Sequence, residues 1–436
     1  MHTVSLPFHG TPKGSAGDII QQKGSEFMDY EALLHEILNI GEAMLKSGAE
    51  VDRAEDSMYR MCKSYDLISC EVFAIQSNIQ ATIQPKGGHY LTQIRRVRGT
   101  SFNYDRLDYL NNLSRQICRN APGPKEMHEM YLEVMNRKPQ PKLLSHLAAI
   151  MGGAGFGVYF GCDFQDALVA TLICSLIIVC AGDWLSKREN NLVVYNMVLS
   201  FLSAVSILLI AKLGLGNHPD RIILGVSMVL ISGLGTTNGI RDVLNHDIIA
   251  GILNIANSFL GAIAIACGIG LAMIVLKGAM YEMYIAPDMA VQLISCGLAS
   301  MGFALFFKAA PRQSACAGIG GLINCACYTL VYQATANNFT ATLTGAVFVA
   351  GYAYVMSRIH RAPSTIFLTT SVMPIIPGAT LFYMMHGFVQ ADYTFALQQT
   401  LKLFQTCLAI AFGFIIIEII TRYISFFANA LHHRQE

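Results

Sequence analysis

Charge is scarce in this chain. Only 14% of its 436 residues are Asp, Glu, Lys or Arg, whereas a soluble domain usually carries about 25%. The net charge of +1 excludes nucleic-acid binding through bulk electrostatics, so we expect no nucleic-acid partner. Walker A loops, GxSxG elbows and HExxH helices are also missing, which argues against ATP hydrolysis and against two common hydrolase sites.

The chain has cysteines but no cysteine pattern. Its twelve cysteines are scattered, many inside apolar runs, and no CxxC pair occurs. We interpret them as buried thiols, so we expect no disulfide framework, no metal site and no cofactor. The chain starts without a basic segment followed by a short apolar run, so we expect no signal peptide.

What the chain does contain is long apolar runs, which are unevenly placed. Residues 1–142 are polar and mixed in sign, whereas the remainder consists mostly of runs long enough for a bilayer. We predict a flexible tail over residues 1–28, a small α+β domain over 29–142, and a membrane domain in two halves, 143–276 and 289–426. Membrane lipid is therefore an expected partner.

Hydrophobic periodicity defines the α+β domain. An amphipathic helix is predicted from Asp29 to about Lys46. Segments 69–76, 79–84 and 89–96 predict a small antiparallel sheet, and two further helices follow over 105–119 and 125–136. Ser47 and Glu50 have the spacing of a capping box that opens a second helix. We therefore interpret the nearby charges as a solvated helix face and not as an acid–base site; they are Glu50, Arg53, Glu55 and Asp56.

The membrane domain divides into about ten α-helical spans of roughly twenty residues each. They are expected at 143–161, 165–185, 194–213, 221–238, 247–276, 289–307, 314–333, 338–357, 364–386 and 400–426. Five spans per half is an odd number, so the second half would be inverted relative to the first. Inverted repeats of this kind are typical of secondary transporters.

Lys and Arg in the loops predict the orientation. With the α+β domain in the cytoplasm, nine of them lie on the inner side and four on the outer side, which places both termini in the cytoplasm. The inner set is Lys187, Arg188, Arg241, Lys308, Arg312, Arg358, Arg361, Arg422 and Arg434, and the outer set is Lys212, Arg221, Lys277 and Lys402.

Two predicted spans are interrupted by residues that break helices. The first break carries Gly233, Gly235, Thr236, Thr237, Asn238 and Gly239, followed by the charged pair Arg241–Asp242. The second carries Pro374, Pro377 and Gly378. Irregular backbone at membrane depth is tolerated only where it is buried in protein or lines a wet cavity. Both breaks are therefore candidate binding sites.

Two alignments relate the breaks. Placing Gly233 over Gly378 puts MVLISG over MPIIPG at an offset of 145 residues, and GFGVYF (155–160) lies over GFALFF (302–307) at an offset of 147. Two matches in the same order at nearly one offset indicate an internal duplication. Paired broken helices at matching points of two halves point to a transporter's binding site.

The candidate substrate-binding residues come from the two breaks and the span after the first. They are Gly233, Thr236, Thr237, Asn238, Arg241, Asp242, Asn254, Asn257, Pro374, Pro377, Gly378 and Tyr383. Hydroxyls, amides and freed backbone groups could together hold a small-molecule substrate with a carboxylate and an ammonium group. The competing interpretations are a helix-packing patch or a cytoplasmic turn at the first break, an ordinary proline kink at the second, and hydrogen bonds across helices for the two asparagines.

Intramembrane carboxylates are few. Asp183, Asp242 and Glu418 are the candidates for proton coupling. For Glu418 the competing interpretation is a salt bridge with Arg422, four residues further on. For Asp183 it is an interfacial position beside Trp184.

Four segments resemble a known family: SGAEVDRAEDSMYRM (47–61), ISGLGTTNGIRDVLNHDIIAG (231–251), MGFALFFKAAPR (301–312) and PSTIFLTTSVMPIIPGATLFYMM (363–385). In this order they resemble the bacterial threonine/serine exporter family. The resemblance implies a cytoplasmic N-terminal domain fused to the membrane domain, and export of small amino acids across the inner membrane by the proton gradient. The chain departs from the expected pattern at Ser232, where a proline would precede Gly233 as Pro377 precedes Gly378.

Two alternatives stay open. The cargo could be a dicarboxylate, with Arg241 as its anion partner, because a split pair in this family is associated with succinate export. The chain could instead be a membrane-anchored hydrolase or sensor that acts through its N-terminal domain, although no residues here establish a hydrolase. The sequence also leaves the oligomeric state open, a homo-oligomer included.

Overall fold

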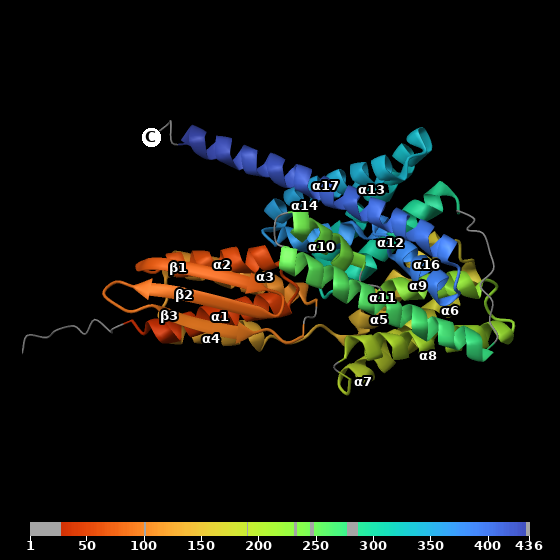
Figure 1. Cartoon of the computed structure of the whole chain (residues 1–436), viewed down its shortest axis with the longest axis horizontal. Helices are drawn as coiled ribbons and strands as arrows, with labels where there is room; N and C mark the ends of the chain where they lie inside the picture. Colours follow the sequence, from red (N-terminus) through yellow and green to blue (C-terminus); the bar gives the residue numbers. More distant parts are fainter. Residues whose placement is uncertain are drawn as a thin grey trace, which may run out of the picture.

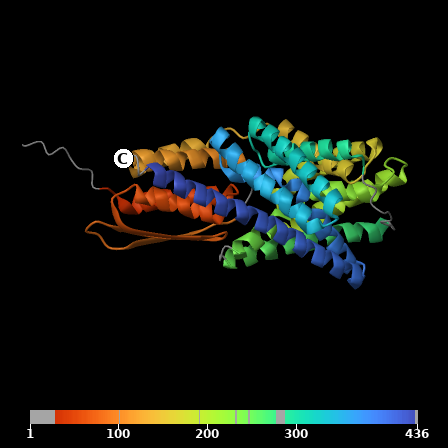
Figure 2. The same ribbon diagram turned by 90° about the horizontal axis from the view of Figure 1, so that it is seen from above.

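The computed structural model describes residues 28–99, 102–189, 191–230, 233–244, 248–276 and 287–432. Its first part, the N-terminal unit of residues 28–135, combines helices with one small sheet. A short connection leads to the second part, the bundle of residues 142–432, which is made of helices (Figure 1). Seen from above, the N-terminal unit lies at one end of the bundle (Figure 2).

The N-terminal unit places four helices on one face of the sheet (Figure 2). The helices are α1 (Tyr30–Lys46), α2 (Val51–Lys63), α3 (Tyr104–Asn120) and α4 (Pro124–Met135), and the strands are β1 (Leu67–Ile75), β2 (Asn78–Pro85) and β3 (Leu91–Arg96). The strands are antiparallel in the order β1-β2-β3. Along β2, Ile79, Ala81 and Ile83 alternate into the core and are fully buried, which is the period of a half-buried strand.

The predicted capping box between Ser47 and Glu50 is wrong. Ser47 is the C-cap of α1, and its N–H bonds back to the carbonyl of Ala43 at 3.0 Å. Gly48 then turns the chain with φ +93°, which glycine adopts without a Cβ clash. Glu50 is the N-cap of α2 but makes no side-chain cap bond, because its carboxylate is used elsewhere.

Helices account for the regular structure described in the bundle. They are α5 (Lys142–Tyr159), α6 (Phe164–Ile173), the π-helical η1 (Cys174–Ala181), α7 (Gly182–Ser186), α8 (Leu192–Lys212), α9 (Pro219–Leu230), α10 (Gly233–Leu244), α11 (Ile248–Leu276), α12 (Met289–Phe306), α13 (Pro311–Thr335), α14 (Asn338–His360), α15 (Ser364–Ser371), the 3₁₀ turn η2 (Met373–Ile375), α16 (Gly378–Val389) and α17 (Tyr393–His432).

This is an α-helical membrane protein. Seven helical segments among the described residues are long and apolar enough to cross a bilayer, and α15 with the segment Met373–Phe388 makes an eighth, bent by 42°. The other two expected spans correspond to α5 and to the pair α9–α10, which are not among these segments. The ten-span count therefore stays a prediction.

The two halves meet where α5 crosses α12. At the offset of 147, Gly152 aligns with Ala299 and Gly155 aligns with Gly302. The contacts are crossed: a Cβ added at Gly155 would lie 3.1 Å from the Cβ of Ala299, and one at Gly302 would lie 2.5 Å from the backbone nitrogen of Gly152. Small residues thus let the two backbones approach closely. Reciprocal contacts of this kind are what a two-fold axis produces.

Corresponding helices also make corresponding contacts in the two halves. Helix α8 packs on α11, and its counterpart α14 packs on α17. Helix α10, which follows the first break, runs along α11, and α16, which follows the second break, runs along α17. The parts of the chain that follow the two breaks therefore occupy matching places in the bundle.

Candidate functional site

The structure brings the segments after the two breaks together. Helix α16 begins at Gly378, and α10 is described over Gly233–Leu244. The residues just before Gly233, Ile231 and Ser232, lie outside the described residues, so the first break stays a prediction. Both helices contribute to one apolar cluster with α11 and α17. Its buried members are Ile240, Ala262, Ala266, Leu381, Met384, Leu403, Cys407 and Ala411. The candidate residues that follow the first break lie on α10 and Tyr383 lies on α16, and both helices pack against α11 and α17.

The glycines of the first break serve helix packing. A Cβ added at Gly235 would lie 2.1 Å from the hydroxyl of Ser258, and one at Gly239 would lie 2.6 Å from the carbonyl oxygen of Gly251. Because Ser258 and Gly251 belong to α11, the glycines let α10 and α11 touch backbone to backbone. This is the helix-packing interpretation, and it applies to Gly235 and Gly239.

The polar residues of the first break are only partly accessible. Thr237 is fully buried, and its hydroxyl lies 4.0 Å from the sulfur of Cys407 on α17. Asn238 is half-buried. Two candidates, Thr236 and Arg241, have side chains that lie outside the described part of the structure.

A chain of amide contacts connects Asp242 to the N-terminal unit. The Asn254 amide donates to the Asp242 carboxylate at 2.8 Å, and the Gln76 amide, from the turn between β1 and β2, donates to the Asn254 oxygen. Asn254 thus bonds across helices and also reaches the N-terminal unit. Asn257 is exposed on the bundle surface, so the two asparagines play different parts.

Buried polar groups surround the second break. Pro377 and Gly378 are buried, and Pro374 is half-buried. The Ser371 carbonyl has lost its helical partner, because the Ile375 N–H bonds to Val372 instead. The Asn324 amide of α13 donates to that carbonyl at 3.0 Å, as expected where neighbouring helices satisfy a broken span.

Asn324 is a residue that sequence reasoning missed. Its side chain is fully buried, and its Oδ1 atom has no hydrogen-bond partner among the described residues. A buried acceptor without a partner is costly, about 1–3 kcal/mol, and calls for an explanation. The available signal was a lone amide within an apolar span, which has no spacing to distinguish it.

The remaining carboxylate candidates differ in their surroundings. Asp183 is exposed in the first turn of α7, beside Trp184. The ring of Trp184 stacks under Arg188, with the guanidinium carbon 4.0 Å from the ring centroid. The interfacial interpretation of Asp183 stays a prediction. Glu418 is half-buried on α17. Its expected partner Arg422 has a side chain outside the described set, so the predicted salt bridge stays a prediction.

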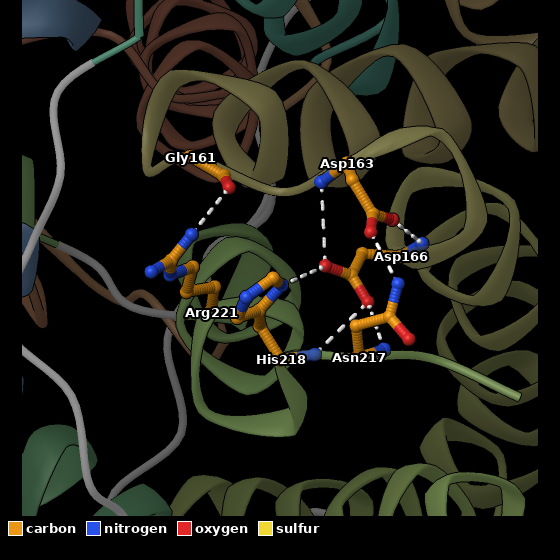
Figure 3. A network of polar contacts seen from close by, with 6 residues as sticks. All are labelled: Gly161, Asp163, Asp166, Asn217, His218 and Arg221. Atoms are coloured by element: carbon orange, nitrogen blue, oxygen red, sulfur yellow. Dashed lines mark hydrogen bonds and ion pairs between the residues drawn. The ribbon is translucent and has the colours of Figure 1, made fainter. Parts of the chain in front are cut away.

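A polar network that the sequence analysis did not single out ties α6 to α9 (Figure 3). Asp166 is completely buried. One of its oxygens accepts the N–H groups of Asn217 at 2.7 Å and His218 at 3.1 Å. The other accepts His218 Nδ1 at 2.8 Å and the Asp163 N–H at 3.3 Å. Arg221 donates to the Gly161 carbonyl at 2.8 Å.

Three groups of this network offer metal-ligand atoms within 4.8 Å of one another, namely Asp163, Asp166 and His218. Both Asp166 oxygens, however, already accept two N–H groups each, so a cation would have to displace several of these bonds. The arrangement caps α6 and fixes the two residues that precede α9, which explains it without a ligand. The spacing of Asp163 and Asp166 is the local signal that could have predicted it.

Arg53 and Asp56 are exposed, as expected of a solvated helix face, but Glu50 and Arg53 also contact the bundle. Arg53 donates to the Ser364 hydroxyl at 2.6 Å, and Thr365 lies 3.4 Å from the Glu50 carboxylate. Both partners belong to the first turn of α15, in the broken span. The sequence could not show this because the contacts join residues more than 300 positions apart.

Comparison with known proteins adds the family context. Two family models match the chain, and both carry the description threonine/serine exporter: the first matches residues 35–276 and the second residues 292–420. The chain is also similar to a "Probable threonine/serine exporter" of Mycobacterium tuberculosis, with 23% identity over 430 residues that cover 94% of this chain and 79% of that protein. No solved structure matches the chain.

Proposed function

This chain belongs to the threonine/serine exporter family, and on that premise we propose that it is a proton-driven secondary transporter that exports threonine, serine or a similar small polar amino acid. It would lie in the bacterial inner membrane. The N-terminal unit and both termini would face the cytoplasm, as the loop charges predict.

The observation that carries the substrate site is the Oδ1 atom of Asn324 beside the second break, which has no hydrogen-bond partner in the described part of the chain. A transported amino acid brings an ammonium group that needs acceptors. The Asn324 oxygen is an acceptor held in place, because its own amide is already fixed to the Ser371 carbonyl at 3.0 Å. Both groups sit where α15 ends, and the C-terminal end of a helix favours a cation.

The carboxylate of the substrate would bind at the start of α16. Pro377 and Gly378 end the irregular stretch and begin a twelve-residue helix, whose first N–H groups form the positive end of a helix dipole. The ammonium group of a zwitterion would thus lie at the C-terminal end of α15, and its carboxylate at the N-terminal end of α16, on the two sides of the second break. This division of charge is the general scheme for substrate sites at broken helices.

Coupling to protons would fall to Asp242 and Glu418, which belong to the matching helix systems α10–α11 and α16–α17. Asp242 is half-buried and hydrogen-bonded to Asn254. A carboxylate within a membrane bundle is costly to keep charged, so it is suited to gain and lose a proton during a transport cycle.

The crossed contacts of α5 and α12 support a transport mechanism by alternating access. In proteins built from two inverted halves, the conformation open to one side converts to the other when the halves exchange their arrangements. The close crossing at Gly155 and Gly302 provides a fixed contact about which such a change could occur.

The test is export from cells that are loaded with a threonine-containing dipeptide. External threonine and serine are followed over time with and without the protein, and with and without an uncoupler. We expect faster appearance that collapses with the uncoupler. If intact protein in the membrane makes no difference, the amino-acid assignment is wrong, and a parallel measurement with labelled succinate decides whether the cargo is a dicarboxylate.

A further inference from the structure

The network of Figure 3 has a counterpart in the second half of the bundle. At the offset of 147, Asp163 aligns with Ala310 and Asp166 with Gln313. Asp166 accepts the N–H of Asp163 at 3.3 Å, and Gln313 accepts the N–H of Ala310 at 3.3 Å. The two side chains therefore cap α6 and α13 in the same way.

The two caps differ in what else they hold. In the first half, Asp166 binds the backbone N–H groups of Asn217 and His218, which lead into α9. Asp166 thereby holds the α5–α6 connection against the start of α9, the first helix of the first broken segment. The contact is internal to the bundle, with Asp166 completely buried and Asn217 exposed.

In the second half, the N-terminal unit supplies the equivalent contacts. Asp108 of α3 accepts the Gln313 amide at 3.2 Å, and the Lys308 carbonyl accepts the N–H of Asp105 at 3.0 Å. The same unit reaches the first turn of α15 through Arg53 and Glu50. The N-terminal unit thus contacts both the α12–α13 connection and α15, the first helix of the second broken segment.

The two closures lie at opposite ends of the bundle. In Figure 1 the N-terminal unit occupies the left end, whereas α6 and α9 lie toward the right end. Helix α5 starts beside the N-terminal unit and ends at Tyr159. Its C-terminal end leads into the α5–α6 connection, where the Asp166 network lies. A transporter that opens at alternate ends has to release each closure in turn.

We propose that the N-terminal unit is the reversible closure of its own end of the bundle, and that it must undock from the α12–α13 connection and the start of α15 before substrate can enter there. The proposal rests on the proposed transport function and adds to it the element that gates one side. Its docking surface includes Phe307, Lys308, Gln313, Ser364 and Thr365, and Asn254 of α11, which Gln76 contacts.

The contacts suit an element that opens as a unit. The ring of Phe307 packs on the rings of Phe102 and Tyr104, with centroids 4.5 and 5.7 Å away. Hydrogen bonds surround this aromatic cluster. The side chain of Arg53 is 52% exposed, so water can replace the bonds it loses. Interfaces between domains of one chain commonly have this mixed character and permit relative motion.

The experiment locks the N-terminal unit in place. Asp105→Cys and Lys308→Cys introduce thiols at two residues joined by a backbone hydrogen bond of 3.0 Å. An added oxidant can join them as a disulfide, or a short bis-methanethiosulfonate reagent can bridge them through two mixed disulfides, with sulfinate as the leaving group. We expect cross-linking to lower threonine export at least tenfold, and reduction to restore it. The matched control is Asp66→Cys with Lys86→Cys, an exposed ion pair of 2.5 Å within the N-terminal unit, which also loses one acid and one lysine. Bridging the control pair should leave export unchanged.

A second readout does not depend on the cargo. Thr365→Cys places a thiol at a docking residue that is only 5% exposed, and its modification by a charged maleimide is followed in purified protein, with the native cysteines as background. The proposal predicts that the Asp105–Lys308 bridge slows this modification at least tenfold. Equal modification rates, or undiminished export by the bridged protein, would overturn it. Absence of threonine export from the reduced protein, with slowed modification in the bridged one, would instead refute the cargo and leave the closure standing.

Discussion

The rings of Phe156 and Phe303 meet edge to face at the crossing of α5 and α12, with centroids 5.6 Å apart and planes at 74°. The internal alignment superimposes these two residues. A residue can touch its own counterpart only near a two-fold axis, because elsewhere the axis carries it to a distant place. The pair therefore marks the position where such an axis would pass, between two helices that small residues bring together.

The α5–α12 crossing predicts which glycine the fold cannot replace. Gly302→Ala would place a Cβ 2.5 Å from the Gly152 nitrogen and 2.8 Å from the Met151 carbonyl carbon, and both are backbone atoms that cannot rotate away. We expect a loss of about 1–3 kcal/mol or more, seen as a lower melting temperature in detergent. Gly351→Ala on α14 is the control, because its Cβ would meet only Ile417 at 3.9 Å. Equal melting temperatures for the two variants would contradict the close crossing.

Asn324 provides the most direct test of the substrate site. Asn324→Leu removes the unpartnered acceptor together with the amide that holds the Ser371 carbonyl, whereas Asn324→Asp keeps an acceptor in the same place. We expect the leucine variant to lose export by roughly tenfold or more, the size of one buried hydrogen bond to a charged group. The aspartate variant should retain substrate affinity better. The Michaelis constant and maximal rate of threonine export measure both effects. If export stays normal with leucine, Asn324 does not contact substrate.

The sequence predicted those features that depend on neighbouring residues. Length and hydropathy located the helices, and proline and glycine located the second break, after which α16 begins at Gly378. The first break falls on Ile231 and Ser232, outside the described residues, and stays a prediction. The strands lie within two residues of their predicted bounds. These are local signals, because a helix or strand is decided largely by its own side-chain period.

The features that it did not predict are long-range contacts. Asp166 meets His218 across 52 residues, and Arg53 meets Ser364 across 311. Neither pair has a spacing that a single sequence can reveal. The glycines of the first break illustrate a different ambiguity. The same residues suit a substrate site and a close helix contact, and only the position of α11 shows that Gly235 and Gly239 serve packing.

The Asp166 network predicts a loss of stability when its acceptor is removed. Asp166→Asn puts a donor where N–H groups already point, so at least one buried N–H loses its acceptor, at a cost of about 1–3 kcal/mol. We expect a clear fall in the melting temperature. Asp288→Asn is the charge-matched control, because Asp288 is exposed and makes no side-chain cap bond. Since the network is explained as a cap, a chelator should leave the wild-type melting temperature unchanged, and a fall would point to a bound cation instead.

The two asparagines of α11 should differ in function. Asn254→Leu removes the donor that meets Asp242 at 2.8 Å and also the acceptor that meets Gln76. We expect slower export with a changed dependence on the proton gradient, because the Asp242 carboxylate loses the group that stabilises its charge. Asn257→Leu, on an exposed position three residues further on, should change export less than twofold. Equal effects from the two leucines would show that the Asp242 contact is unimportant.

Docking of the N-terminal unit should depend on pH through Asp108. Burial raises the pKa of this carboxyl group, and Asp105 on the same helix adds to the rise, while Gln313 from α13 and Arg115 oppose it. One of its oxygens, Oδ1, is buried without a partner among the described residues. A raised pKa in the docked state means that docking favours the protonated form. Docking should therefore strengthen as the pH falls through the raised pKa toward the ordinary value of about 3.9, and weaken above it. Because the thiolate is the reacting species, modification of every cysteine slows as the pH falls. Modification of Thr365→Cys in purified protein should slow more over this range than that of the exposed Cys180, and Asp108→Asn, which is permanently neutral, should keep this low relative rate at higher pH. If both proteins show the same pH profile, a group other than Asp108 controls docking.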